Sequence, residues 1–172
     1  EFMLTLIIGG AASGKSEFGE NLVLSLPGQR VYVATMEPWD DECLARIRKH
    51  RRQREGKGFL TLERYRDLGG LEVPAGANVL LECMSNLLAN ELYSPQGGGK
   101  AAVLGGVERL LGRCANLTIV TNEVFSGGTD YQGDTLRYLR ELGEVNRVLA
   151  ARADLVVEVV CGCANVLKGR VP

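Results

Sequence analysis

A glycine-rich stretch near the start of the chain has residue types and spacing suited to binding nucleotide phosphates. It fits the pattern Gly, four residues, Gly, Lys and Ser or Thr, and it follows the apolar run 4–8. Backbone N–H groups and a helix N-terminus can there converge on phosphate oxygens, with Lys15 bridging the β- and γ-phosphates and the Ser16 hydroxyl binding Mg²⁺. The alternative is a glycine-rich turn with an incidental lysine. The predicted nucleotide contacts are Gly9, Gly10, Ala11, Ala12, Ser13, Gly14, Lys15 and Ser16.

Two glutamates that follow apolar runs are candidates for the carboxylate of a magnesium site. Glu82 ends the run 78–82, and Glu123 follows the run 117–122. P-loop proteins commonly place an acidic residue at the end of a second strand, where it helps to hold the metal. Either glutamate could bind Mg²⁺ through water, contact the nucleotide or cap a strand end, and the sequence leaves this choice open.

His50 is the only histidine of the chain, and it lies within a strongly basic segment. Six of the nine residues from Arg46 to Arg54 are Arg or Lys. At helical spacing His50 and Arg54 lie one turn apart, beside a face that carries Leu44 and Ile47. Nearby cations disfavour imidazolium, lower the histidine pKa and leave a neutral nucleophile that could attack an α-phosphate. A solvated basic face and a small nucleic-acid contact are the alternatives, and these residues alone do not decide.

Length and composition fit one globular domain without a global affinity for nucleic acid or membrane. The 172 residues carry a formal net charge of −1, and no apolar run approaches the roughly 18 residues of a membrane span. Interleaved aromatic residues are absent from the basic segment, which disfavours nucleic acid as a partner. Glu1 and Phe2 precede Met3 and are interpreted as remnants of cloning, so the predicted domain comprises residues 3–172.

The five cysteines predict structural thiols in a reducing cytoplasm. They form no Cys-x-x-Cys motif and cannot all pair, and most lie in or beside apolar stretches, where cysteine behaves as a small hydrophobe. The Cys-x-Cys at 161–163 makes a poor metal site with one distant histidine, so we expect no metal cage. The cysteines are Cys43, Cys83, Cys114, Cys161 and Cys163.

The order of apolar and helical patterns predicts an α/β fold. Five continuous, β-branched runs are typical of strands buried on both faces of a parallel sheet, and they alternate with segments of helical periodicity. We therefore expect a single domain of the P-loop NTPase type, with a mostly parallel sheet flanked by helices and a loop at 94–100. The predicted strands are 4–8, 30–35, 78–82, 117–122 and 155–160, and the predicted helices are 16–26, 40–54, 84–93, 101–115 and 134–152.

Taken in order, these motifs resemble the bifunctional adenosylcobinamide kinase/adenosylcobinamide-phosphate guanylyltransferase family of cobalamin biosynthesis. The P-loop alone is generic, whereas the basic helix RIRKHR followed by LLEC and TNEV is specific to this family. The matching stretches are LIIGGAASGKSEFGE (6–20), VYVAT (31–35), DDECLARIRKHR (40–51), VLLECMSNLLANELY (79–93), IVTNEVFSGG (119–128), GEVNRVLAARADLVVEVVCG (143–162) and LKG (167–169).

The resemblance implies which residues act. It places the family's guanylylated histidine on His50 and makes His50 and Lys15 the predicted catalytic residues. Many relatives have a tryptophan beyond the basic helix, where this chain has Phe59. Besides the P-loop, the implied nucleotide contacts are Ala34, Thr35, Met36, Arg51, Arg52, Gln53, Arg54, Glu63 and Glu82.

The resemblance also implies a two-part reaction. A nucleoside triphosphate, ATP or GTP, would phosphorylate adenosylcobinamide, and GTP would then give its GMP through a guanylyl-histidine to yield adenosylcobinamide-GDP. Mg²⁺ as cofactor, a corrinoid substrate and a homotrimer belong to the same expectation. The rivals are a plain P-loop kinase without a covalent intermediate, a GTP-binding regulatory module, and a nucleic-acid binder with salt-sensitive affinity.

Overall fold

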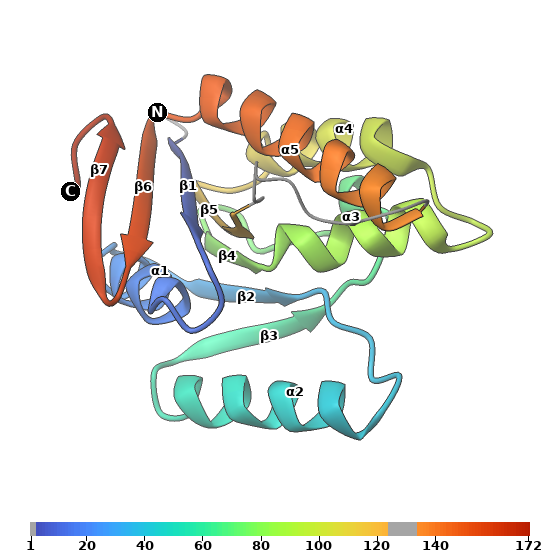
Figure 1. Ribbon diagram of the computed structural model, residues 1–172. Coiled ribbons are helices and arrows are strands. Elements are labelled where there is room, and N and C mark those ends of the chain that lie inside the picture. Colours follow the sequence, from blue (N-terminus) through green and yellow to red (C-terminus); the bar gives the residue numbers. More distant parts are fainter. Residues whose placement is uncertain (1–2, 124–133) are drawn as a thin grey trace.

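One sheet, in the order β3-β2-β4-β5-β1-β6-β7, forms the centre of the molecule (Figure 1). The computed structural model describes residues 3–123 and 134–172, so the predictions for Glu1, Phe2 and motif residues 124–128 lie outside it. All neighbouring strands pair in parallel except β6 and β7, which are antiparallel. The strands are β1 (Met3–Gly9), β2 (Arg30–Ala34), β3 (Phe59–Glu63), β4 (Asn78–Glu82), β5 (Asn116–Asn122), β6 (Leu155–Val160) and β7 (Cys163–Lys168).

Helices cover both faces of this sheet, which confirms the predicted α/β class of a mostly parallel sheet flanked by helices. In Figure 1, α3, α4 and α5 lie together, while α2 lies beside β3 at the edge of the sheet. No helix in the described part of the chain has the length and apolar character needed to cross a membrane. The helices are α1 (Lys15–Leu24), α2 (Asp41–Arg54), α3 (Met84–Tyr93), α4 (Gly99–Leu111) and α5 (Asp134–Arg152), with a 3₁₀ turn η1 (Leu68–Gly70).

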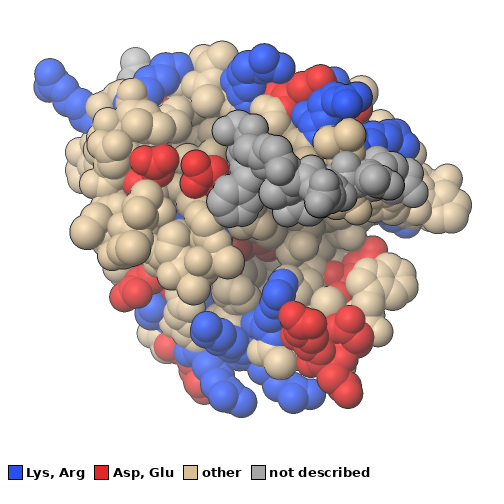
Figure 2. All heavy atoms as spheres, viewed as in Figure 1, with Lys and Arg blue, Asp and Glu red and all other residues tan. Residues whose placement is uncertain are grey.

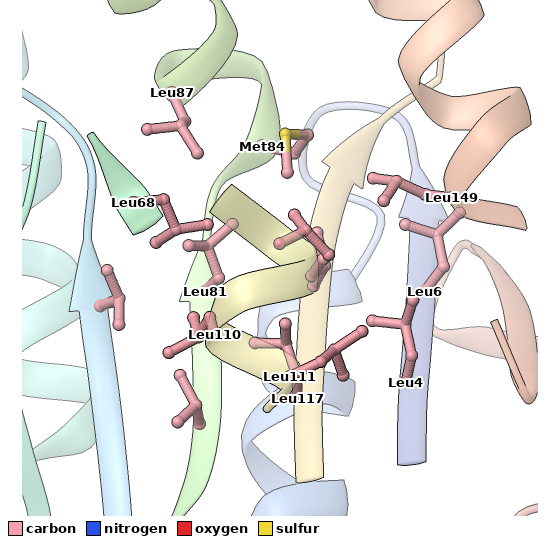
Figure 3. Packing of buried hydrophobic residues seen from close by; sticks show 14 of the residues in the cluster. Leu4, Leu6, Leu68, Leu81, Met84, Leu87, Leu110, Leu111, Leu117 and Leu149 are labelled. Atoms are coloured by element: carbon pink, nitrogen blue, oxygen red, sulfur yellow. The ribbon is translucent and has the colours of Figure 1, made fainter. Parts of the chain in front are cut away.

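The apolar runs of the central strands are continuous because each strand is packed on both faces. One cluster joins the sheet to α3, α4 and α5, and a smaller cluster joins its other face to α1. Burying one leucine side chain contributes about 1.5–3 kcal/mol, so these clusters are a main source of the stability of the sheet. Figure 3 labels part of the larger cluster: Leu4, Leu6, Leu68, Leu81, Met84, Leu87, Leu110, Leu111, Leu117 and Leu149.

Helix α2 is positioned by its ends more than by an apolar face. The Asp40 carboxylate accepts a hydrogen bond from the Cys43 N–H at 2.7 Å, and Arg54 is the only one of its described residues that is fully buried. Acidic side chains fill its first turn and basic ones its last turn, as the helix dipole favours. Figure 2 shows the basic side chains along α2, with acidic ones gathered at its start.

Two strands and part of the cysteine interpretation differ from the sequence prediction. β3 and β7 were not predicted, and α4 begins inside the expected loop 94–100. Cys114 is buried, and burial raises its pKa to about 11, as expected for a structural thiol. Cys161 and Cys163 are exposed beside Gly162 at the β6–β7 turn, so these two do not pack as small hydrophobes.

Candidate active site

The carboxyl ends of the parallel strands bring the predicted site residues together. Ala34 at the end of β2 is level with Glu63 of β3 on one side and with Glu82 of β4 on the other. The end of β1, which leads into the P-loop, is level with Asn122 of β5. In open α/β sheets this edge is where ligands bind, because loops and helix N-termini converge on it.

A cleft of about 630 Å³ opens at this edge, a volume in the range of small-ligand sites. Of the predicted nucleotide contacts, Gly9, Gly10, Thr35 and Arg52 do not line it. The predicted site residues that do line it are Ala11, Ala12, Ser13, Gly14, Lys15, Ser16, Ala34, Met36, His50, Arg51, Gln53, Arg54, Glu63 and Glu82.

The P-loop has the backbone that its glycines predict. Gly14 has φ 93°, in the left-handed region, and leads directly into α1. At Gly9 a Cβ would lie 2.5 Å from the Ser13 hydroxyl oxygen and 2.8 Å from the Val159 carbonyl oxygen. Any larger residue at position 9 would therefore displace either the loop or β6.

Lys15 folds back onto its own loop. Its Nζ donates a hydrogen bond to the Gly10 carbonyl at 2.8 Å. Burial lowers the pKa of Lys15, while the charges of Cys83 and Glu82 act in the opposite direction. A phosphate oxygen is a better partner for this half-buried ammonium than a neutral carbonyl, since a charge-assisted hydrogen bond is the stronger one.

His50 projects from α2 to the carboxylate at the end of β4. Its Nδ1 lies 3.2 Å from Oε2 of Glu82, and the same oxygen accepts the Tyr32 hydroxyl at 2.5 Å. Tyr32 and Glu82 are buried, and the His50 side chain is 30% exposed at the cleft. The only histidine of the chain thus faces the nucleotide cradle with one ring nitrogen engaged.

Arg54 is buried beneath the cleft, where it packs on the ring that holds Glu82. Its guanidinium carbon lies 3.4 Å from the centre of the Tyr32 ring, a cation–π contact, and its Nη2 donates to the Thr61 hydroxyl at 3.2 Å. Its Nε and Nη1 atoms are buried without a hydrogen-bond partner in the described residues. Buried donors without partners are costly, so these two nitrogens suit an anionic ligand.

Two further contacts tie α2 to the body of the protein. Arg51 Nη2 lies 3.1 Å from Oε1 of Glu63, and Gln53 Nε2 donates to Oε2 of the buried Glu20 at 2.5 Å. The first joins α2 to the end of β3, and the second joins it to α1. Although little of α2 is buried, side chains of its last two turns contact α1, β3 and β4 around the cleft.

Thr35 connects β2 to β4 rather than facing the cleft. Its hydroxyl donates to the Cys83 carbonyl at 2.9 Å and accepts from the Cys83 N–H at 2.8 Å. We expect Thr35→Val to lower the free energy of unfolding by about 1–3 kcal/mol, because the Cys83 N–H loses its partner and the Cys83 carbonyl keeps only the Leu87 N–H. Urea unfolding measures the loss, and titration with GTP checks the site. A large loss of GTP affinity at unchanged stability would instead indicate direct contact with the nucleotide.

The cleft fits a magnesium ion that is carried mainly by the nucleotide. The described residues contain no group of three or more His, Cys, Asp or Glu side chains arranged for a metal. Ser16 and Glu82 line the same cleft, and Oε1 of Glu82 is buried without a hydrogen-bond partner among the residues described. Glu123 is exposed and does not line the cleft. One hydroxyl, one carboxylate, phosphates and water are an ordinary ligand set for Mg²⁺.

Sequence patterns did not single out several residues that line the cleft. Tyr32 lies two residues before Ala34, so the period-two alternation of a strand places both on one face. This signal was present, whereas Asn86 and Asn122 carry no local pattern that marks them. The lining residues not predicted are Glu17, Tyr32, Arg46, Ile47, Lys49, Thr61, Cys83, Asn86, Val120 and Asn122.

Comparison with known proteins identifies the family that uses such a cleft. The family model described as cobinamide kinase / cobinamide phosphate guanyltransferase matches residues 5–167. The chain belongs to this family. It is accordingly an enzyme, a cobinamide kinase and cobinamide phosphate guanylyltransferase of cobalamin biosynthesis that uses nucleoside triphosphates.

Three curated relatives are similar in sequence to this chain over nearly their whole length. The chain is 34% identical to the bifunctional adenosylcobalamin biosynthesis protein CobU of Escherichia coli, with 96% of this chain and 100% of the relative covered. It is 33% identical to the protein of the same name from Salmonella typhimurium, again over 96% and 100%. The bifunctional adenosylcobalamin biosynthesis protein CobP of Pseudomonas aeruginosa is 33% identical, over 97% of this chain and 98% of its own.

Proposed function

We propose that the enzyme phosphorylates adenosylcobinamide and then transfers GMP to the product through a covalent guanylyl-His50 intermediate. The observation that supports this most is that His50 and the P-loop line one cleft, although 34 positions separate Ser16 from His50 in the chain. A nucleotide whose phosphates lie on the P-loop can therefore present its α-phosphate to the histidine. A plain P-loop kinase has no use for a histidine held there.

In the kinase half-reaction, the P-loop positions the triphosphate and the hydroxyl of the corrinoid side chain accepts the γ-phosphoryl group. Lys15 moves from the Gly10 carbonyl to the phosphates, where it offsets the charge that develops during transfer. Ser16 and Glu82 would hold Mg²⁺, which when bound neutralises charge on the phosphate oxygens. The two buried, unpartnered nitrogens of Arg54 suit a second phosphate contact.

In the transferase half-reaction, a nitrogen of His50 attacks the α-phosphorus of GTP. A P–N bond forms, the bond between the α-phosphorus and its bridging oxygen breaks, and pyrophosphate leaves. An oxygen of the corrinoid phosphate then attacks the same phosphorus, the P–N bond breaks, and the histidine is restored. Two displacements let the acceptor meet GMP on the enzyme after pyrophosphate has gone.

Two further parts of the proposal are that the enzyme works as a homotrimer and that it resides in the cytoplasm. The first rests on resemblance to the family alone, and the second rests on the cysteines, which are free in the structure. The exposed apolar side chains of Val166 and Leu167 on the edge strand β7 are compatible with contact between subunits.

Covalent labelling tests the proposal directly. Protein incubated with Mg²⁺ and GTP labelled at the α-phosphate should retain label after denaturation, in a form stable to base and lost in acid. GTP labelled at the γ-phosphate should leave none, and adenosylcobinamide phosphate should remove the α-label as product. Peptide mapping should place the label on His50. A folded, GTP-binding enzyme that takes no α-label would overturn the covalent route and leave the direct kinase.

A further inference from the structure

One carboxylate oxygen accepts a phenol hydroxyl and lies close to a ring nitrogen of the histidine, next to the nucleotide cradle. Oε2 of Glu82 lies 2.5 Å from the Tyr32 hydroxyl oxygen and 3.2 Å from Nδ1 of His50. Tyr32 supplies a proton to this contact, because burial and the neighbouring charge of Glu82 both raise the pKa of its phenol. Glu82 is therefore the acceptor in the first contact. In the second contact a carboxylate oxygen 3.2 Å away favours a hydrogen on Nδ1 of His50, because a nitrogen lone pair there would face the negative oxygen.

The surroundings make this arrangement rigid. Glu82 is 8% exposed and lies at the end of the interior strand β4, level with Ala34 of β2. The Tyr32 ring is held between the Arg54 guanidinium on its face and the Phe59 ring, which meets it edge-on at 6.4 Å. A carboxylate fixed in this way cannot follow the histidine elsewhere, so the histidine ring takes the orientation that the carboxylate imposes.

We infer that Glu82, held by Tyr32, is a positioning residue that keeps the proton of neutral His50 on Nδ1 and leaves the lone pair of Nε2 facing the cleft. Within residues 3–123 and 134–172, Nε2 has no hydrogen-bond partner. The inference concerns how the histidine of the proposed function is oriented, and it therefore rests on that function for its catalytic meaning.

The same contact gains strength during the reaction. When Nε2 bonds to the α-phosphorus, the ring carries phosphorus on one nitrogen and hydrogen on the other, so it becomes positively charged. The carboxylate 3.2 Å from Nδ1 stabilises this charge more than it stabilises the neutral ring, and only such a differential interaction accelerates the step. Oε1 of Glu82 is buried and lacks a partner among the described residues, so it remains available for the nucleotide or its metal.

The single histidine of the chain makes the tautomer directly measurable. With ¹⁵N-labelled imidazole, the NMR spectrum of the whole protein reports one ring, without assignment. The measurement is made about two pH units above the ordinary histidine pKa of ~6.5, where a free neutral imidazole favours the Nε2–H form. We expect the Nδ1–H form to dominate in the wild type. A dominant Nε2–H form would overturn the inference whether or not any variant folds.

Variants separate positioning from a merely structural role. Glu82→Gln offers an amide that can donate to Nδ1, so we expect the Nε2–H form to gain the majority. Tyr32→Phe should retain the Nδ1–H form but slow guanylyl-enzyme formation about tenfold, because the carboxylate is less firmly held. Glu55→Gln, a change in an exposed acid just after α2, is the matched control and should leave the tautomer as in the wild type. An unchanged tautomer in folded Glu82→Gln would contradict the assignment.

Single-turnover labelling gives the readout that links the tautomer to reaction. At saturating GTP, Glu82→Gln should form the guanylyl-enzyme about 10²–10³-fold more slowly, with a much smaller change in the GTP concentration needed for half-saturation. A variant that lost only GTP affinity would show a binding role instead. If the wild type forms no guanylyl-enzyme but its tautomer depends on Glu82, the proposed function fails while the positioning stands.

Discussion

Replacing His50 with asparagine is expected to abolish guanylyl transfer while phosphorylation of cobinamide stays within about threefold of the wild-type rate. Loss of a covalent nucleophile typically costs about 10⁴–10⁶ in rate, because the remaining groups can only bind and orient the substrate. The kinase step relies on the P-loop, which asparagine at position 50 does not touch. Two assays on one preparation measure the two activities separately: γ-phosphoryl transfer from ATP for the kinase, and pyrophosphate release from GTP for guanylyl transfer.

The neighbouring Arg48 provides the matched control for this experiment. It lies on the same helix, is exposed and does not line the cleft, so Arg48→Ala should leave both activities close to those of the wild type. Asparagine can still meet Glu82 through its amide, which limits disturbance of the buried carboxylate. Equal loss of both activities would mean that His50 organises the cleft as a whole. Retention of guanylyl transfer would exclude His50 as the nucleophile.

The central fold could be predicted from the sequence because its strands are buried on both faces. Such strands appear as continuous apolar runs, and β1, β2, β4, β5 and β6 all occur where these runs predict them. β3 and β7 lie at the two edges of the sheet, where one side lacks a partner strand and fewer side chains are buried. Every residue of β7 is exposed, so no apolar run marks it. Its position depends on pairing with β6, which is a tertiary contact.

In the candidate site, too, local motifs could be predicted from the sequence, whereas contacts between distant segments could not. The P-loop is a local motif in which the glycines, Lys15 and Ser16 are set by one turn, so the sequence identified it directly. For Glu82 the sequence left three roles open, because what it contacts depends on Tyr32 from β2 and His50 from α2. Similarly, nearby charges in sequence suggested a histidine surrounded by cations, whereas the fold brings a carboxylate to its ring.

Replacing Lys15 with alanine is expected to reduce both activities, the kinase by about 10³-fold, in contrast to the selective loss at His50. In the proposed function both reactions place a triphosphate on the same P-loop, in a cleft of about 630 Å³ that suits one nucleotide. In the structure Lys15 Nζ donates to the Gly10 carbonyl at 2.8 Å, and alanine leaves that carbonyl without this donor. Steady-state kinetics with ATP, and the rate of α-label uptake from GTP, measure the two effects.

A graded series identifies what Lys15 contributes. Lys15→Arg keeps the charge but replaces a compact ammonium with a larger planar group. We therefore expect its kinase rate to lie between those of Lys15→Ala and the wild type. Lys168→Ala removes a lysine that also donates to backbone carbonyls, those of Ala150 and Ala151, at the end of β7 opposite to the turn that contacts the P-loop, and both activities should persist. If Lys15→Ala lost the kinase alone, GTP for guanylyl transfer would have to bind without the P-loop lysine. In that case the two reactions would use different phosphate sites, and a non-hydrolysable ATP analogue would fail to compete with α-labelled GTP.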